Sequence, residues 1–228
     1  MWQVIHGDCL EVLPTLGKVD CVLTDPPYGM AYRSSRRTES ERFSAVDGDD
    51  KFDATAQYAW IAALLRVLAD NGAVYSFASD HHLGDFRVAF GACGFTVKRT
   101  LVWVKDAWTS GDLEGDYGHS TEFVVYATKG RHILNGRRVS NVMNVARVPP
   151  NDLTHPCEKP VALLRRLLRK SAEPGMTILD PFCGSGSTGV AALQEGMNFI
   201  GIEKEAKYVE IARRRIGAEA AQGKLGFA

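Results

Sequence analysis

A glycine-rich run in the last quarter of the chain joins a predicted strand to a predicted helix. It spans residues 180–189 and reads Asp-Pro-Phe-Cys-Gly-Ser-Gly-Ser-Thr-Gly, so Gly184, Gly186 and Gly189 form a G-x-G-x-x-G pattern. Glycines at this spacing allow a sharp turn and a close approach of the backbone to a ligand, and the helix N-terminus supplies free N–H groups. Glu203 ends the next predicted strand, where it can bind the two ribose hydroxyls of a nucleotide. The run therefore predicts an α/β sheet that holds a nucleotide-type cofactor.

The rest of the chain supports this fold class, because strand-like and helix-like runs alternate as they do in domains with a mainly parallel sheet. Strands are predicted at residues 3–6, 19–24, 73–78, 96–104, 122–127, 176–179 and 198–202. Helices are predicted from Asp53, a good N-cap, to residue 70, closed by Asn71-Gly72, and at 81–92, 160–172, 188–195 and 206–216. The tail from Gly217 is expected to fray. A length of 228 residues fits a single domain.

A second loop, Asp25-Pro26-Pro27-Tyr28-Gly29, also follows directly on an apolar strand. Two consecutive prolines remove two backbone donors and fix two φ angles. The Pro26 carbonyl is thereby presented as an acceptor beside the Asp25 carboxylate, and Tyr28 adds an aromatic face. Two rigid acceptors beside an aromatic ring suit a planar group that carries an –NH₂. A plain surface turn is the alternative, but it requires neither the tyrosine nor the apolar strand.

Together, the Asp-Pro-Pro-Tyr element at residues 25–28 and the Asp-Pro-Phe-Cys-Gly-Ser-Gly element at 180–186 resemble the amino-methylating DNA methyltransferases that use S-adenosylmethionine. Their order, with the proline element first and the glycine element last, is similar to that of the circularly permuted β group of these enzymes. Gly7-Asp8, Trp103-Val104-Lys105 and the run from His155 to Pro160 agree with the same family. The resemblance covers nearly the whole chain.

The resemblance implies an α/β fold of the circularly permuted, seven-stranded, Rossmann-like methyltransferase type, with a mostly parallel sheet and helices on both faces. In that fold the strands that end at Asp25 and Asp180 are neighbours, so both loops meet at the switch point of the carboxyl edge. The implied reaction is methyl transfer to the exocyclic amine of a nucleotide that is flipped out of double-stranded DNA and stacked on Tyr28. Hydrogen bonds to Asp25 and to the Pro26 carbonyl would favour positive charge on this weakly nucleophilic nitrogen. Asp25 is expected to stay ionised, with an ordinary or lowered pKa.

The resemblance also assigns site residues one by one. Asp25, Pro26, Pro27 and Tyr28 would form the catalytic loop. Glu203 would hold the ribose of the cofactor, Asp8 would accept from its adenine amine, and His155 and Lys159 would approach its methionine end. The glycine loop would line the cofactor through Asp180, Phe182, Cys183, Gly184, Ser185, Gly186, Ser187 and Thr188. Asp8 as a turn residue, His155 as a loop histidine, Lys159 as a solvated helix start and Cys183 as a small packing residue are the alternative readings.

In this family, members whose proline element begins with aspartate usually methylate N6 of adenine. Members whose element begins with serine usually methylate N4 of cytosine. Adenine-N6 is therefore the expected target, and N4-cytosine is the alternative. A methyltransferase acting on protein glutamine or on RNA fits less well, because its motifs run in the opposite order. A nicotinamide-dependent oxidoreductase would not need Asp-Pro-Pro-Tyr, and a DNA-binding module without activity would not need both loops. A cognate restriction endonuclease is an expected partner, and the enzyme itself is expected as a monomer or a homodimer.

The chain carries 27 Lys and Arg residues against 27 Asp and Glu residues, which at first argues against a nucleic-acid partner. The charges are segregated, however. Residues 127–151 contain no acid but hold Lys129, Arg131, Arg137, Arg138 and Arg147, and they coincide with a short target-recognition insertion that the resemblance implies at about 127–153. A second basic run, Arg33, Arg36 and Arg37, follows the catalytic loop, and acids gather at 39–53. We expect both basic runs to contact DNA phosphates, and a solvated loop is the alternative for each.

Composition excludes several other classes of protein. Hydrophobic residues make up 45% of the chain and charged residues 24%, which rules out a disordered or collagen-like chain. The five cysteines are widely spaced and form no C-x-x-C pair, so neither a metal site nor a disulfide framework is indicated. The sequence shows no signal peptide and no apolar stretch long enough to cross a membrane, so a cytoplasmic location without a membrane partner is expected.

Overall fold

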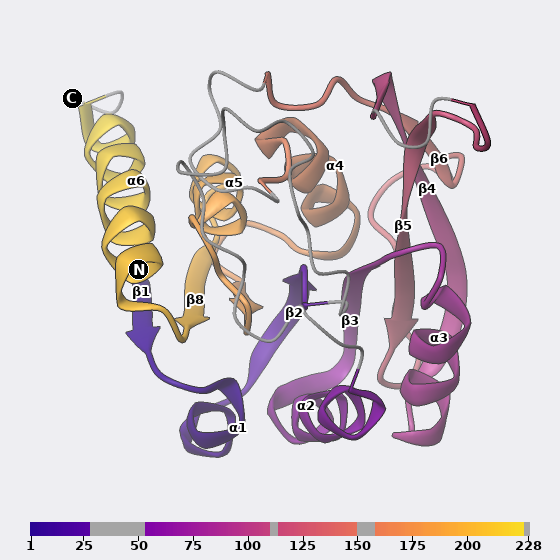
Figure 1. Cartoon of the computed structure of the whole chain (residues 1–228). Helices are drawn as coiled ribbons and strands as arrows, with labels where there is room; N and C mark the ends of the chain where they lie inside the picture. The colour runs from indigo at the N-terminus through magenta and orange to yellow at the C-terminus, as the bar shows by residue number, and fades with distance from the viewer. Residues whose placement is uncertain (28–52, 110–113, 150–157, 226–228) are drawn as a thin grey trace.

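The computed structural model describes residues 1–27, 53–109, 114–149 and 158–225, in which one sheet of eight strands is covered by helices on both faces (Figure 1). The strands lie in the order β1-β8-β7-β2-β3-β5-β4-β6. Their bounds are β1 Trp2–His6, β2 Val19–Thr24, β3 Leu68–Ala78, β4 Thr96–Thr109, β5 His119–Thr128, β6 Val142–Asn144, β7 Thr177–Asp180 and β8 Asn198–Glu203. Within the described ranges β5 is antiparallel to its two neighbours, and the other neighbouring pairs are parallel. The expected mostly parallel, Rossmann-like sheet is confirmed.

The sheet has one strand more than the seven expected. The additional strand is β6, which pairs with β4 at the edge of the sheet, from Val102↔Val142 to Val104↔Asn144. Its central residue, Met143, is buried, and the residues on either side are exposed. A three-residue edge strand carries too little apolar alternation to be recognised from its sequence.

Helices cover the two faces of the sheet in two layers (Figure 1). One layer contains α1 (Cys9–Val12), the 3-10 turn η1 (Leu13–Thr15), α2 (Ala54–Val67) and α3 (Leu83–Ala92), and the other contains α4 (Val161–Ser171), α5 (Ser187–Gln194) and α6 (Ala206–Leu225). Successive residues of a strand point to opposite faces, so each face has its own core. Cys21 and Leu23 of β2 belong to the core beside α4, α5 and α6, whereas Val22 belongs to the core beside α2 and α3.

Local sequence explains how the helices form these layers. α4 buries four leucines at helical spacing, residues 163, 164, 167 and 168, so one stripe of the helix faces the sheet. α2 begins at Asp53, as expected of an N-cap, because the Asp53 carboxylate accepts a hydrogen bond of 2.9 Å from the N–H of Thr55. Within the described residues, no helix is both long and apolar enough to span a membrane.

The predicted end of the first long helix is wrong. α2 ends at Val67 instead of residue 70, and β3 follows at once with Leu68 paired to Val19. Leu68 is fully buried, so pairing with β2 overrides the helical spacing of the sequence. Asn71, expected to close the helix, adopts a positive φ of 62° inside an irregular stretch of β3.

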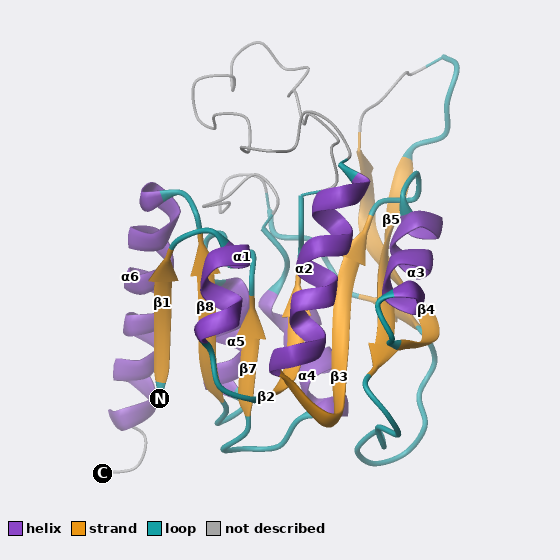
Figure 2. Cartoon of the chain, turned by 90° about the horizontal axis from the view of Figure 1, so that it is seen from below, coloured by secondary structure: helices purple, strands orange, loops and turns teal. Residues whose placement is uncertain are grey.

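Three other elements are longer than predicted. α6 continues to Leu225 instead of fraying from Gly217, because the residues that follow Gly217 are mostly good helix formers. β4 and β5 also extend toward each other, to Thr109 and from His119. Figure 2 shows this antiparallel ribbon projecting beyond the carboxyl ends of the other strands.

Candidate active site

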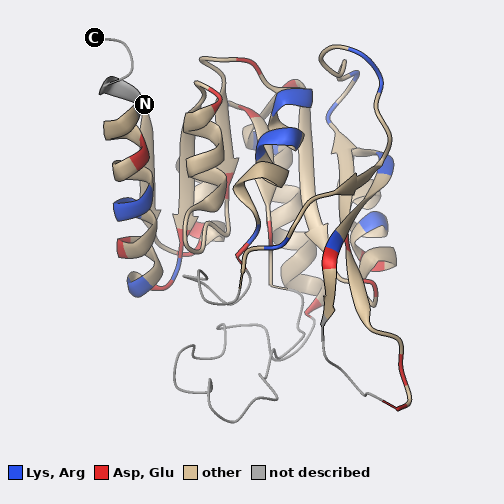
Figure 3. Cartoon of the chain, turned by 90° about the horizontal axis from the view of Figure 1, so that it is seen from above, with Lys and Arg blue, Asp and Glu red and all other residues tan. Residues whose placement is uncertain are grey.

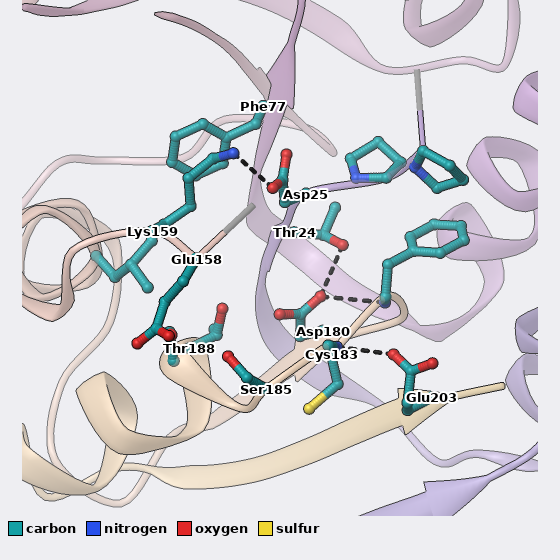
Figure 4. A pocket seen from close by; sticks show the side chains of 16 residues that line it. Thr24, Asp25, Phe77, Glu158, Lys159, Asp180, Cys183, Ser185, Thr188 and Glu203 are labelled. Carbon is teal, nitrogen blue, oxygen red and sulfur yellow. Dashed lines mark hydrogen bonds and ion pairs between the residues drawn. The ribbon is translucent and has the colours of Figure 1, made fainter. Parts of the chain in front are cut away.

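The two loops singled out in the sequence meet at the carboxyl edge of the sheet. β2 and β7 are adjacent and parallel, paired through Cys21↔Ile178 and Val22↔Leu179. The hydroxyl of Thr24 donates a hydrogen bond of 2.7 Å to Asp180 Oδ1, which ties the ends of the two strands together (Figure 4). The strand order departs in opposite directions from this pair, so the loops lie at the switch point of the sheet. The prediction that these strands lie side by side is confirmed.

A cavity of about 110 Å³ lies between the loops. Most of its walls are residues that the sequence singled out: Asp25, Pro26, Pro27, Lys159, Asp180, Phe182, Cys183, Gly184, Ser185, Ser187, Thr188 and Glu203. Thr24, Phe77, Glu158 and Leu164 complete the lining. Figure 4 shows side chains from the proline loop, the glycine loop and the start of α4 surrounding this cavity.

The carboxylate of Asp25 belongs to a chain of alternating charges. Lys159 Nζ lies 2.6 Å from Asp25 Oδ2 and 3.1 Å from Glu122 Oε2. Lys105 Nζ lies 2.8 Å from the other oxygen of Glu122. The Lys159 ammonium, expected near the methionine end of a cofactor, thus contacts the carboxylate assigned to catalysis, and it is too buried for the alternative reading as a solvated helix start.

This arrangement shifts the pKa values of Asp25 and Glu122 in opposite directions. Burial raises the pKa of Asp25 to about 7, although the Lys159 ammonium acts to lower it. The expectation of an ordinary or lowered pKa for Asp25 is therefore wrong, because the sequence does not reveal how deeply the side chain is buried. Burial also acts to raise the pKa of Glu122, but Lys159 and Lys105 outweigh it and hold that pKa below its usual value. Near neutral pH, Glu122 is ionised and Asp25 is close to its titration midpoint.

Asp180 shapes the turn that follows β7. Its carboxylate accepts hydrogen bonds from the Thr24 hydroxyl, from the N–H of Phe182 at 3.1 Å and from the side chain of Thr188. Burial nevertheless raises the pKa of Asp180 to about 6. The aspartate therefore fixes the start of the glycine loop from within, and the same side chain lines the cavity.

Glu203 closes the other side of this loop. Its two oxygens accept hydrogen bonds of 2.8 Å from the N–H groups of Gly184 and Glu205, and burial raises its pKa. The next strand, β1, ends beside it, because Gly7 N–H donates to the Glu203 carbonyl at 3.0 Å. Asp8 follows there as the N-cap of α1 and accepts from the N–H of Leu10 at 2.9 Å. Asp8 thus has the local role of its alternative reading, and its contact with a cofactor adenine stays a prediction.

The glycines of the loop allow close packing as well as unusual backbone angles. Gly184 and Gly186 have φ values of 51° and 84°, in the left-handed region. A Cβ at Gly186 would lie 3.1 Å from Ala212 Cα on α6, so a side chain there would press on a backbone atom.

Cys183, in the same loop, has a buried side chain, and burial raises the pKa of its thiol well above the usual range. Both facts favour a packing role for the cysteine over a nucleophilic one.

Sequence reasoning did not identify Arg215, which holds the glycine loop from α6. Its Nη1 donates to the carbonyl and hydroxyl of Ser185 at 3.0 and 2.7 Å, and to the Ser187 hydroxyl at 3.4 Å. Its Nη2 lies 2.6 Å from the carboxylate of Glu158, next to Lys159 in sequence. The guanidinium therefore links both predicted serines to the start of α4. Arg215 stands in a run of three arginines, which offered no signal to distinguish it.

Gln57 and Trp60, also missed, hold the proline loop from α2. Gln57 Nε2 donates to the Pro27 carbonyl at 2.9 Å, and Trp60 Nε1 donates to Gln57 Oε1 at 2.6 Å. The Trp60 ring meets the ring of Phe182 edge-on, with centroids 5.4 Å apart. These contacts connect the two loops behind the cavity. Gln57 is buried, but the sequence alone does not show this, because a polar residue is expected on the exposed face of a helix.

Some predicted residues lie outside the described residues, and others lie away from the cavity. Tyr28, Arg33, Arg36, Arg37 and His155 are outside the described ranges. The run Arg131–Arg138 lies at the amino edge of the sheet, because Arg131 N–H donates to Asn71 Oδ1 and Lys170 Nζ donates to the Arg137 carbonyl. Figure 3 shows basic residues of this loop at the edge opposite to the active-site loops.

Arg131, Arg137 and Arg138 thus lie away from the proline loop, and their contact with DNA phosphates stays a prediction. They follow β5, which is antiparallel and carries the chain back to the amino edge. Arg147 differs, since its N–H donates to Asp106 Oδ1 at 3.0 Å, beyond the point where β6 stops pairing with β4. Arg147 is thus the basic residue of the described part of this run that lies toward the carboxyl edge.

Known proteins resemble the chain over nearly its whole length. Residues 19–214 match the family described as DNA methylase, the N6/N4 methyltransferases. YubD of Escherichia coli (strain K12), which carries a provisional methylase name, is 34% identical over 220 residues, which cover 96% of this chain and 91% of YubD. The type II methyltransferase M2.DpnII of Streptococcus pneumoniae is 31% identical over 240 residues, which cover 95% of this chain and 90% of that enzyme.

Solved structures agree in architecture. The crystal structure of the M1.HpyAVI–SAM complex matches with a TM-score of 0.77 and 26% identity, covering 95% of this chain and 99% of the other. The PvuII DNA methyltransferase, which is cytosine-N4-specific, matches with a TM-score of 0.76 and 15% identity, covering 97% and 92%. At that identity the likeness to the PvuII enzyme shows the fold alone.

Proposed function

The chain belongs to the N6/N4 DNA methylase family, and we propose that it is a site-specific DNA methyltransferase that transfers a methyl group from S-adenosylmethionine to the N6 amine of adenine. The observation that carries the proposal is the junction of β2 and β7, which brings the proline loop and the glycine loop to the walls of one cavity. A methyl donor on the glycine loop and an amine on the proline loop would then be close enough for direct transfer.

The residues around the glycine loop fit S-adenosylmethionine. Gly186 leaves backbone N–H groups at the start of α5 uncovered by a side chain, which suits the carboxylate of a methionine moiety. Asp180 and Glu203 line a small cavity that suits a cationic sulfonium. When bound, S-adenosylmethionine supplies an activated methyl group. The likeness to M1.HpyAVI, which was solved with SAM, supports the same assignment.

The proline loop would hold the target amine. The Pro26 carbonyl and the Asp25 carboxylate would accept the two N–H bonds, whereas the Pro27 carbonyl accepts from Gln57. Ionised Asp25 stabilises the positive charge that develops on nitrogen as it gains a fourth bond. The methylated nitrogen then has one proton too many, and a carboxylate with a pKa of about 7 is well matched to receive it. Tyr28 would stack on the flipped base.

Adenine is proposed over cytosine because Asp25 heads the proline loop, as in family members that act on N6. The order of the two elements, with the proline loop on β2 and the glycine loop on β7, supports assignment to the permuted β group. The likeness to M2.DpnII, a type II methyltransferase, supports action at a specific DNA sequence within a restriction–modification system. N4-cytosine methylation is the second candidate, since both bases offer the same amine geometry.

The test is nucleoside mass spectrometry on DNA from cells that express the chain, beside cells that express Asp25→Ala. We expect N6-methyladenine only with the unaltered chain, and equal S-adenosylmethionine affinity by calorimetry for both proteins. N4-methylcytosine alone would correct the target base. Full methylation by Asp25→Ala would overturn the assigned chemistry.

A further inference from the structure

A second, larger cavity lies at the amino edge of the sheet, remote from Asp25. Its volume is about 660 Å³, within the range of about 300 to 1,000 Å³ that is typical of ligand sites. Its walls come from β3, β4, β5, β6, the segment that joins β5 to β6, and the second half of α4. Neither the proline loop nor the glycine loop contributes to it. The cavity is therefore separate from the proposed active site.

The charge around this cavity is of one sign. Its lining includes five cations and no carboxylate: Lys98, Arg99, Arg138, Arg166 and Lys170. Two other arginines of α4, Arg165 and Arg169, both pair with Glu195. Among the described residues no carboxylate forms an ion pair with any of the five cations. Like charges gathered without counter-charges repel one another, and an anionic ligand would relieve this repulsion.

The cavity also has an apolar, aromatic wall. Tyr75 and Tyr126 stack with ring centroids 5.0 Å apart and an interplanar angle of 18°, and Leu101 and Met143 belong to the same lining. Both tyrosines are part of the hydrophobic core, with exposed fractions of 2% and 8%, so they bound the cavity as a rigid wall. An apolar wall together with guanidinium groups suits a ligand that combines a ring with negative charge.

One ring nitrogen of His132 makes no hydrogen bond within the described part of the chain. Its Nδ1 lies 2.7 Å from the Asn71 carbonyl, which can only accept, so Nδ1 carries the hydrogen. Its Nε2 is buried and has no hydrogen-bond partner among the described residues. Leaving such an atom unsatisfied is unfavourable, so a buried polar atom without a partner usually marks a missing group. His132 lines the cavity, where a ligand hydroxyl would supply that group.

We propose that this cavity binds a phosphate ester of nucleotide size, with the base against the apolar wall and the phosphate among the arginines. Guanidinium groups match the geometry of phosphate oxygens with two parallel hydrogen bonds. The same chemistry is offered by a free nucleotide and by a nucleotide within a DNA strand. The assignment does not depend on methyl transfer at Asp25.

The test measures binding of two probes to the full chain, thymidine 5′-monophosphate and a ten-residue oligothymidylate. Thymine has no exocyclic amine, so neither probe can occupy the proline loop as a substrate. The altered protein carries Arg138→Glu and Arg166→Glu. The matched control carries Arg66→Glu and Arg214→Glu, with the same change of charge on exposed residues outside the cavity lining and outside both predicted DNA-binding runs. Thermal melting checks that both variants fold, and Arg138→Gln with Arg166→Gln replaces a variant that does not.

We expect the cavity variant to weaken binding about tenfold or more and the control less than about threefold, since charge-assisted contacts carry most of the affinity. Asp25→Ala should bind both probes normally. Binding of both probes with this dependence identifies a site for free nucleotides, and binding of the oligomer alone identifies a site for a strand. Equal losses in the two charge variants, or no binding of either probe at millimolar concentration, would overturn the proposal.

Discussion

Replacement of Lys159 by methionine should shift the pH dependence of methyl transfer upward. Methionine keeps much of the apolar stem but removes the ammonium that lies 2.6 Å from Asp25 Oδ2. An opposite charge this close lowers the pKa of a carboxyl by about 1 to 3 in general. Without it, the pKa of Asp25 should rise from about 7 to about 8 to 10.

The size of the effect follows from the ionised fraction of Asp25, because only the carboxylate stabilises the positive charge that develops on the amine and can then receive its proton. At pH 7 that fraction is about one half when the pKa is 7, about one tenth when it is 8, and about one thousandth when it is 10. The rate at neutral pH should therefore fall about 5-fold to 500-fold, and raising the pH should recover much of it. The unaltered enzyme should itself reach half of its maximal rate near pH 7.

Single-turnover transfer of a labelled methyl group to DNA, followed from about pH 6 to about pH 10, measures this midpoint. Lys105→Met is the matched control, because Lys105 contacts Glu122 at 2.8 Å and has no ion pair with Asp25 among the described residues. Its midpoint should move by less than half as much. An unchanged or lower midpoint in a folded Lys159→Met enzyme would refute the reasoning, since the ammonium would then not control the charge of Asp25.

Two further predictions concern the support of the proline loop and the buried acids. Gln57→Leu removes the 2.9 Å hydrogen bond to the Pro27 carbonyl, so it should slow single-turnover transfer about tenfold or more while S-adenosylmethionine affinity stays within about twofold. Gln194→Leu, which removes an exposed hydrogen bond to Glu219, is the control, and equal rates in the two variants would contradict a positioning role for Gln57. The ligand-free protein should melt at a lower temperature at about pH 8 than at about pH 5.5. Burial raises the pKa of Asp25 to about 7 and that of Asp180 to about 6, so the folded chain binds these protons more tightly than the unfolded chain does. The folded state therefore loses this stability as the pH rises through the two pKa values. In Asp25→Asn, the melting temperature measured by calorimetry should change less with pH near pH 7. A melting temperature that rises from about pH 5.5 to about pH 8 in the unaltered protein would contradict the raised pKa values of Asp25 and Asp180.

The position of the two loops could be predicted because each follows an apolar strand and opens a turn with a distinctive composition. Parallel strands place their carboxyl ends at one edge of the sheet. The expected strand order therefore predicted that Asp25 and Asp180 lie close together. The protonation of Asp25 could not be predicted in this way. It depends first on the burial of Asp25 and then on Lys159 and Glu122, which reach it from the start of α4 and from β5. Only the packed sheet brings those charges within 3.1 Å of one another.

The support behind the loops escaped prediction for a related reason. Gln57 fits a helix as well as any polar residue, and its contact with Pro27 spans 30 positions in the sequence. Arg215 likewise lies on the last helix, and its bond to Glu158 spans 57 positions. Helical periodicity reports which face of a helix is buried, but not which loop that face will meet.

The charge pattern of the sequence likewise does not show which basic residues lie on the same surface. An acid-free run such as residues 127–151 suggests one basic surface, but nine extended residues can span about 30 Å, roughly the height of a small sheet. Between Arg138 and Arg147 the chain passes through β6, which is parallel to β4 and leads from the amino edge toward the carboxyl edge. Residues that are neighbours in sequence thus serve opposite edges: Arg138 joins Arg166 and Lys170 around the second cavity, whereas Arg147 lies beside Asp106, toward the edge that carries Asp25. A basic run therefore identifies a DNA-binding surface only after strand pairing shows which of its residues share an edge.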